Sequence, residues 1–156
     1  MNIYTGDISE KKEIIQAFKS FAEEVLKRDV TEKILRYMNG YLREYKGYVY
    51  TFNTPISLPE GIHFIKKGLF LGKVKRIRTE YIFEPSHQFL LTMHKGEIKR
   101  TVSFAPDSQE LVKYLKGETI FIKDINKYSP GIAGISVNGY PIGWGKIDRE
   151  GRIKNL

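Results

Sequence analysis

Apolar residues recur at three- and four-residue spacing between residues 9 and 28, and lysines and glutamates fill most of the positions between them. This spacing predicts an amphipathic helix over 9–28 with Ser9 as its N-cap, because one face of a helix repeats about every 3.6 residues. The expected buried face consists of Ile14, Ile15, Phe18, Phe21, Ala22, Val25 and Leu26. We expect this face to pack on a sheet in the same lobe.

The next part of the chain carries shorter patterns. A second helix is predicted at 31–39, because apolar and charged residues again alternate in helical order. β-branched and aromatic runs, bounded by Gly, Pro and Asn, predict three strands, at residues 47–52, 62–65 and 70–74. Pro85 and Ser86 are expected to begin another helix, which continues through Phe89, Leu90 and Met93.

After residue 97 the pattern changes to mainly β. The expected elements are a strand at 100–104, a helix at 108–115, a strand at 118–122 and a last strand at 152–154. We therefore expect an α+β protein of two lobes, with residues 1–94 forming the first and residues 95–156 forming the second.

The segment GISVNGYPIGWGKI, residues 134–147, is the most distinctive stretch. Asn138 and Gly139 both tolerate positive φ and so predict a type I′ hairpin between two short strands. Trp144 stands between Gly143 and Gly145, a setting that suits close approach of another strand or of a ligand. Trp144 fits a core position better than a stacking surface, whereas for Tyr140, in the turn, both interpretations stay open.

The amino-acid composition excludes several kinds of functional site. The chain has 156 residues and no cysteine, which excludes disulfides, thiolate metal sites and a cysteine nucleophile. Neither a signal peptide nor an apolar run of the roughly 20 residues that cross a bilayer is visible, so we expect a cytoplasmic protein without membrane association.

The net charge of +8 is unevenly distributed. Residues 1–32 carry 5 basic and 7 acidic side chains, whereas residues 33–156 carry 21 and 11. Such a field favours a polyanionic partner, nucleic acid first. The alternative is that the lysines serve solubility or ion-pair networks.

The best candidate for binding chemistry is a basic cluster without a single acid, KKGLFLGKVKRIR at residues 66–78. Its cations are Lys66, Lys67, Lys73, Lys75, Arg76 and Arg78. Alternation along a strand could align Lys73, Lys75 and Arg76 in a row about 6–7 Å apart, close to the phosphate repeat of a nucleic acid strand. The alternative is a solvated strand face, charged to prevent edge aggregation.

An enzymatic interpretation finds little support. His87 and His94 are seven residues apart, which on one helix is about 10.5 Å along the axis, and His63 stands alone, so we expect no metal site. No phosphate-binding loop or paired carboxylate motif is present, and no cofactor is expected. A distant alternative is a small enzyme that uses His87 with Glu84, which would require both in a concave pocket.

Three segments in order resemble the carboxy-terminal region of the Sun-family RNA cytosine-5 methyltransferases: GLFLGKVKRIR at 68–78, IFEPSH at 82–87, and GISVNGYPIGWGKI with the tail RIKNL at 134–156. The resemblance implies an amino-terminal α/β pre-PUA lobe followed by a small PUA-like β-barrel, which is an RNA-binding module. It also implies a chain without the catalytic domain of that family. The spacer between Gly72 and Phe83 is a few residues longer than the family pattern.

We therefore expect a stand-alone, non-catalytic protein that binds rRNA or tRNA in RNA modification or ribosome biogenesis. The expected contact residues are Lys66, Lys67, Lys73, Lys75, Arg76, Arg78, Tyr140, Lys146 and Arg152. The alternative is a protein adaptor that docks on a separate RNA methyltransferase or ribosome-assembly factor, through an exposed apolar patch such as one on the amino-terminal helix.

Overall fold

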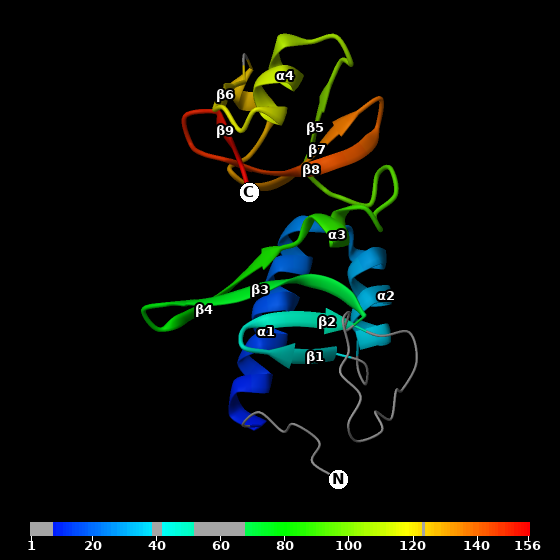
Figure 1. Ribbon diagram of the computed structural model, residues 1–156, viewed down its shortest axis with the longest axis vertical. Helices are drawn as coiled ribbons and strands as arrows, with labels where there is room; N and C mark the ends of the chain where they lie inside the picture. Colours follow the sequence, from blue (N-terminus) through cyan, green and yellow to red (C-terminus); the bar gives the residue numbers. More distant parts are fainter. Residues whose placement is uncertain (1–7, 39–41, 52–67, 123) are drawn as a thin grey trace. The chain divides into compact units, whose positions relative to one another are not determined.

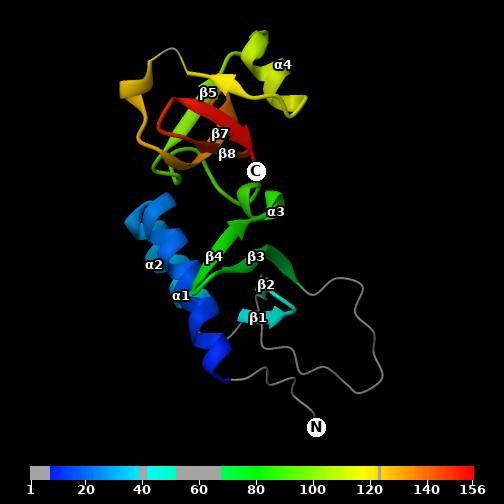
Figure 2. The same cartoon turned by 90° about the vertical axis from the view of Figure 1, so that its left-hand side faces the viewer.

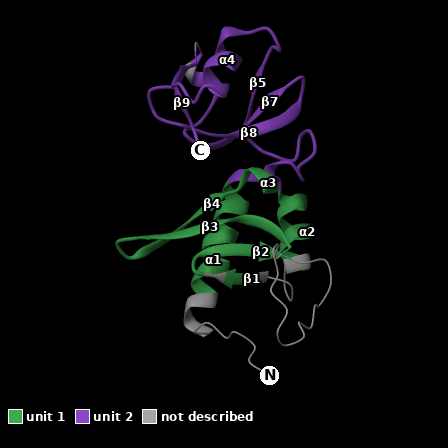
Figure 3. Cartoon of the chain, viewed as in Figure 1, with its two compact units in different colours: residues 1–24, 28–89 green, residues 25–27, 90–156 purple. Residues whose placement is uncertain are grey.

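The computed structural model describes residues 8–38, 42–51, 68–122 and 124–156 (Figure 1). The predicted strand at 62–65 lies outside these residues. The fold is mixed α+β, as expected; it contains two sheets and divides into two compact units. Unit 1 comprises residues 1–24 and 28–89, and unit 2 comprises residues 25–27 and 90–156 (Figure 3).

Unit 1 is built on a four-stranded antiparallel sheet of order β1-β2-β3-β4. The strands are β1 (Leu42–Tyr45), β2 (Tyr48–Thr51), β3 (Leu69–Ile77) and β4 (Glu80–Pro85). Helix α1 (Ile8–Val25) lies against one face of this sheet in both views (Figures 1 and 2). Helix α2 (Arg28–Met38) follows it.

A cluster of phenylalanine rings joins α1 to the sheet. The ring of Phe83 on β4 lies 5.0 Å from the ring centres of both Phe18 and Phe21. Val49 and Leu71 are buried on the two neighbouring strands. The predicted apolar face of α1 is therefore its packing face, with the exception of Ile15, which is 40% exposed. Ala17 is buried instead and continues the helical repeat of the packing face.

The first helix ends three residues earlier than the pattern predicts. Leu26 forms a β-bridge with Ile98, and the Lys27 amide donates to the Glu97 carbonyl oxygen over 2.9 Å. These long-range hydrogen bonds replace the next helical turn, so residues 25–27 belong to unit 2. Asp29 consequently lies in the first turn of α2, where a carboxylate faces the positive end of the helix dipole.

The segment before Ser86 is a strand and not the start of a helix. Residues 80–85 pair with β3 in register, and helix α3 (His87–Leu90) begins after Ser86. Ser86 does begin the helix as predicted, because its hydroxyl accepts from the Phe89 amide over 3.0 Å. The expected continuation to Met93 does not form, since α3 ends at Leu90.

Unit 2 is a five-stranded sheet of order β5-β7-β8-β9-β6, which is curled (Figure 1). Its strands are β5 (Thr101–Phe104), β6 (Ile120–Phe121), β7 (Gly131–Val137), β8 (Tyr140–Ile147) and β9 (Arg152–Asn155). Only the β5–β7 pair is parallel. Helix α4 (Gln109–Leu115) is capped by the Ser108 hydroxyl, and a short 3-10 helix η1 (Ile125–Lys127) precedes β7.

The glycines around Trp144 permit a close contact in the core of unit 2. The Tyr114 hydroxyl donates to the Trp144 carbonyl oxygen over 2.9 Å, and Trp144 is 3% exposed, which confirms its expected interior position. A Cβ at Gly143 would lie 1.9 Å from the Tyr114 hydroxyl oxygen, and a Cβ at Gly145 would lie 2.9 Å from Ile153. Both positions therefore require glycine for packing reasons. Within the described residues, no helix is long and apolar enough to cross a membrane.

Candidate nucleic-acid interface

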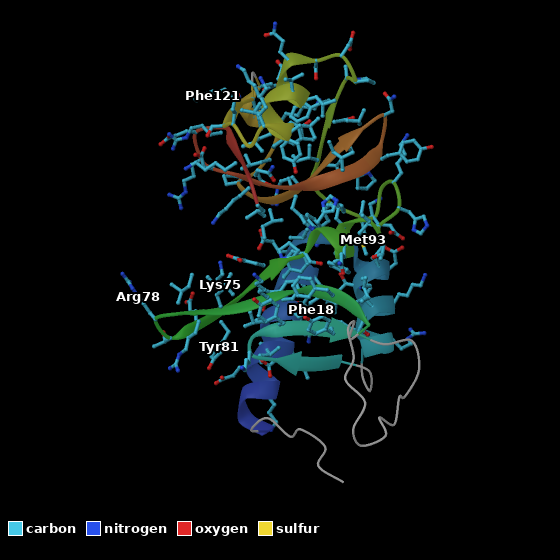
Figure 4. The ribbon with its side chains drawn as sticks, in the orientation of Figure 1. Phe18, Lys75, Arg78, Tyr81, Met93 and Phe121 are labelled. Carbon is cyan, nitrogen blue, oxygen red and sulfur yellow. The ribbon has the colours of Figure 1, made fainter. Side chains whose placement is uncertain are left out.

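The predicted basic strand forms half of a protruding hairpin in unit 1. Strand β2 pairs with β3 only as far as Lys73, whereas β4 pairs along β3 up to Ile77. Residues 75–82, which we call the hairpin arm, therefore form a two-stranded ribbon beyond the sheet (Figures 1 and 4). Nearly all side chains of the hairpin arm are exposed, and Arg78 lies at its far end.

Strand alternation divides the cations between the two faces of β3. Lys73 and Lys75 lie on one face, with Tyr48 and Glu84 opposite Lys73 in register. Arg76 lies on the other face, with its guanidinium carbon 5.8 Å from the ring centre of Tyr81. The expected single row of Lys73, Lys75 and Arg76 is thus split into two, which agrees with Figure 4, where Lys75 and Tyr81 lie on opposite sides of the arm.

Acidic residues from β4 stand beside these cations. The Lys75 ammonium lies 2.8 and 2.7 Å from the two carboxylate oxygens of Glu84. Glu80 is paired with Ile77 in register. The basic cluster at residues 66–78 contains no acidic residue, but the β3–β4 hairpin places Glu80 and Glu84 on the strand next to it. A short turn at Arg78 and Thr79 is the sequence signal that could have predicted this hairpin.

Arg78 adopts a backbone conformation that disfavours its side chain. Its φ is 57°, in the left-handed region, at the first of the two residues that join β3 to β4. Glycine is the usual residue at such a position, because a Cβ in this conformation costs roughly 1–2 kcal/mol. The arm thus carries a strained arginine at its tip.

Aromatic rings, which the sequence reasoning did not single out, accompany the cations of β3. The Lys73 ammonium lies 4.9 Å from the ring centre of Tyr48. Phe70 lies between two tyrosines of β2, with ring centres 5.8 Å from Tyr48 and 5.2 Å from Tyr50. These rings share the face of the sheet opposite to the buried Val49 and Leu71.

A depression of about 360 Å³ adjoins this face of unit 1. It is lined by Phe70, Gly72, Lys73, Glu84, Pro85, Ser86, His87 and Gln88. Glu84 and His87, the two residues of the enzymatic alternative, therefore line the same concavity. His87 is exposed. Glu84 is occupied by Lys75, and the described residues show no hydrogen bond between Glu84 and His87 that would make them an acid–base pair.

In unit 2 the hairpin turn behaves as its sequence predicts. Asn138 and Gly139 have φ values of 52° and 84°, so both adopt the left-handed conformation of a type I′ turn. Tyr140 follows directly and is 75% exposed. A Cβ at Gly139 would lie 2.8 Å from Cε of Lys95, so this lysine crosses the turn and adds a cation that the sequence reasoning missed.

The two remaining predicted contact residues of unit 2, Lys146 and Arg152, differ in whether their charge is held in ion pairs within the described part of the chain. Lys146 is exposed on β8, opposite Lys154 of β9, which is also exposed. Arg152 instead donates from Nε to Asp148 and from Nη2 to Glu150, at 2.6 Å in each case. The Asp148 carboxylate accepts hydrogen bonds from the Arg152 backbone amide and guanidinium, and these bonds lower the pKa of Asp148. The bond between the two side chains also raises the pKa of Arg152. The charge of Arg152 is thus balanced inside the β8–β9 turn.

Two predicted contacts, Lys66 and Lys67, lie outside the described residues, as does His63. Within the described residues no group of three His, Asp or Glu side chains is placed to hold a metal ion.

The chain matches two protein-family models. Residues 20–93 match the RsmF rRNA methyltransferase first C-terminal domain, and residues 101–156 match the Methyltransferase RsmF PUA domain. A search of curated proteins found no match. The two matches follow one another along the chain in the order of units 1 and 2, and together they include all three segments that carry the sequence resemblance. The chain therefore belongs to the family formed by the carboxy-terminal domains of the RsmF-type, Sun-family rRNA methyltransferases.

Proposed function

We propose that this chain binds RNA, rRNA or tRNA, in RNA modification or ribosome maturation. The family assignment supports this proposal, because both matched models describe domains of an rRNA methyltransferase and one is a PUA domain. On this proposal residues of unit 1 form a pre-PUA lobe and unit 2 is the PUA-like module.

The observation that carries the proposal is the hairpin arm with its strained tip. Arg76 and Arg78 are exposed on a ribbon that leaves the sheet, and Arg78 occupies a position where glycine would cost less. Strained backbone conformations cluster at active sites and ligand-binding segments. A guanidinium at the end of an exposed ribbon is well suited to bidentate contact with a phosphate.

Unit 2 offers a second group of contacts. Tyr140 is exposed at the β7–β8 turn, next in sequence to Gly139, against which Lys95 lies, and Lys146 lies opposite Lys154. An exposed ring next to a cation suits an unpaired base and its phosphate. We leave Arg152 out of the contact surface because two carboxylates already occupy its guanidinium.

We further propose that the polypeptide does not itself transfer a methyl group. Both matched domains are carboxy-terminal domains of their family, and the sequence has no cysteine to serve as nucleophile. Its role would be to hold the RNA.

The salt dependence of RNA binding tests this proposal. If four to six phosphates are neutralised on single-stranded RNA, log K should fall with log salt at a slope of roughly −3 to −4. Replacing Lys73, Lys75, Arg76 and Arg78 by glutamine should flatten the slope by roughly two units, because Lys73, Arg76 and Arg78 contact phosphates whereas Lys75 is held by Glu84. The matched control replaces Lys12, Lys19, Lys33 and Arg36, exposed cations of α1 and α2, and should flatten it less. Equal slopes for both variants would contradict the assignment of the binding surface.

A protein adaptor remains the second candidate, favoured by exposed apolar side chains in unit 2. Leu115 at the end of α4 and Phe121 on β6 are each 69% exposed. On α1, where such a patch was expected, the exposed large apolar side chain among the described residues is Ile15. Salt-insensitive binding to a protein partner, lost in a Leu115→Ser, Phe121→Ser variant that still binds RNA, would favour the adaptor.

A further inference from the structure

The outer face of the sheet in unit 1 combines a row of aromatic rings with an adjoining depression. The rings are Tyr48, Phe70 and Tyr50, with ring centres 5.8 and 5.2 Å apart along the row. Phe70 also lines the depression, together with Lys73. An aromatic residue, a cation and a concavity therefore meet at one place within a single unit.

A β-bulge brings Phe70 and Lys73 to the same face. In a regular strand, residues three apart point to opposite faces of a sheet. Here the register shifts between Val49 and Tyr50, so that Val49 pairs with Gly72 and Tyr50 pairs with Phe70. The extra residue in β3 re-aims the side chains, and Lys73 then faces Tyr48 while Phe70 faces Tyr50.

The wall of the depression is fixed to the floor by hydrogen bonds. The Ser86 hydroxyl donates to the Phe70 carbonyl oxygen over 2.5 Å, and the Ser86 amide donates to the Leu71 carbonyl oxygen over 2.8 Å. The next two residues, His87 and Gln88, are exposed and line the depression. The backbone of this wall is thus fixed relative to Phe70 before any ligand arrives, which reduces the ordering cost of binding.

The charges that line the depression favour the binding of an anion near Lys73. Glu84 lines the depression, but both of its carboxylate oxygens are bound to the Lys75 ammonium. Lys73 is held over the Tyr48 ring and is exposed. Its ammonium can therefore bind an anion while the ring keeps the long side chain in place.

We propose that this depression binds one unpaired nucleotide of a single-stranded RNA. The base stacks against Phe70, its edge meets the Gln88 amide and the His87 imidazole, and its phosphate lies on Lys73. A volume of about 360 Å³ is within the range of small-molecule sites. A duplex keeps its base faces stacked on one another, so a site built on a ring selects unpaired RNA. The inference rests on the proposed function, and it adds that unit 1 recognises RNA that is unpaired.

A substitution that removes the ring and keeps an apolar side chain tests the stacking. Phe70→Leu should weaken binding of a single-stranded RNA of eight nucleotides by roughly 5- to 100-fold and leave binding of a 12-base-pair RNA duplex within about twofold. The matched control is Phe121→Leu, which removes an exposed ring of unit 2 and should change neither. Unchanged single-strand binding by Phe70→Leu would overturn the inference and leave the proposed function standing, whereas a wild-type protein that binds neither RNA would overturn both.

A measurement on the wild-type protein covers the case in which Phe70→Leu does not fold. Titration of isotope-labelled protein with the four nucleoside 5′-monophosphates should shift the amide signals of Gly72 and Gln88 and the Gln88 side-chain amide, with saturation. Shifts that do not saturate, or that are confined to unit 2, would contradict the site even where RNA binds elsewhere.

Discussion

The ammonium of Lys75 bridges both carboxylate oxygens of Glu84, at 2.8 and 2.7 Å, across the β3–β4 ladder. Lys75 is 55% exposed and Glu84 42%, so the pair stabilises the fold by no more than about 1 kcal/mol. Its larger effect is on binding, because Glu84 competes with a phosphate for Lys75.

Glu84→Gln should therefore strengthen the binding of single-stranded RNA. Release of Lys75 adds one phosphate contact, so the slope of log K against log salt should become steeper by roughly 0.7. The control is Glu32→Gln, which removes another exposed, ion-paired carboxylate, that of the Arg28 pair on α2, and changes the net charge equally. Weaker binding by Glu84→Gln at low salt would argue against Lys75 as a phosphate contact.

Substitution of Arg78 should separate stability from binding. Arg78→Gly relieves a left-handed residue with φ of 57° and should raise the free energy of unfolding by roughly 1 kcal/mol. The same change removes a cation and should weaken RNA binding. Arg78→Lys, which keeps both the charge and the Cβ, should leave the stability unchanged. Chemical denaturation and RNA titration of the two variants provide the measurements, and a loss of stability in Arg78→Gly would show that the turn gains something from the side chain.

Gly143→Ala should destabilise unit 2 by roughly 1–3 kcal/mol, as expected for overpacking of a well-packed core. The added Cβ would lie 1.9 Å from the Tyr114 hydroxyl oxygen and 2.9 Å from its ring carbon Cζ. In a Tyr114→Phe background the first of these contacts is gone, so the same alanine should cost less. A double-mutant cycle measures this coupling, and additive costs would mean that the strand moves away from the ring.

The alkaline stability of the protein should depend on Tyr114. Burial raises the pKa of the Tyr114 phenol to about 12. The unfolded chain therefore releases this proton first, near the ordinary value of 10.0, and the folded form releases it only near 12. The contribution is complete below pH 10 and is lost as the pH rises from about 10 to 12. Unfolding free energies of Tyr114→Phe should fall less steeply over this window than those of the wild type, and parallel curves would contradict the assignment.

Local patterns predicted those elements that depend on their own residues. The Asn138-Gly139 turn and the packing face of α1 follow from turn chemistry and helical spacing. The end of α1 and the strand β4 were predicted wrongly, because Leu26 pairs with Ile98 and residues 80–85 pair with β3. Pairing over such distances in sequence is not visible in a local window.

In the candidate interface, too, local features were predictable from the sequence and long-range contacts were not. The cations of β3 could be found from the sequence, since clustering without acids is a local property. Their partners could not, because Tyr48 reaches Lys73 from β2 and Glu84 reaches Lys75 from β4. The bulge that turns Phe70 and Lys73 to one face likewise depends on the register of two strands.

Residues 25–27, at the junction of α1 and α2, determine how the two units can be exchanged between proteins. Because residues 25–27 belong to unit 2, the chain passes from one unit to the other three times, after residues 24, 27 and 89. A fragment that starts at residue 95 would lack Leu26, which is fully buried and pairs with Ile98. A single crossover point therefore divides at least one unit, unit 1 if it falls after residue 24, unit 2 if it falls after residue 89 and both if it falls after residue 27, so the two units are exchanged intact only as one block.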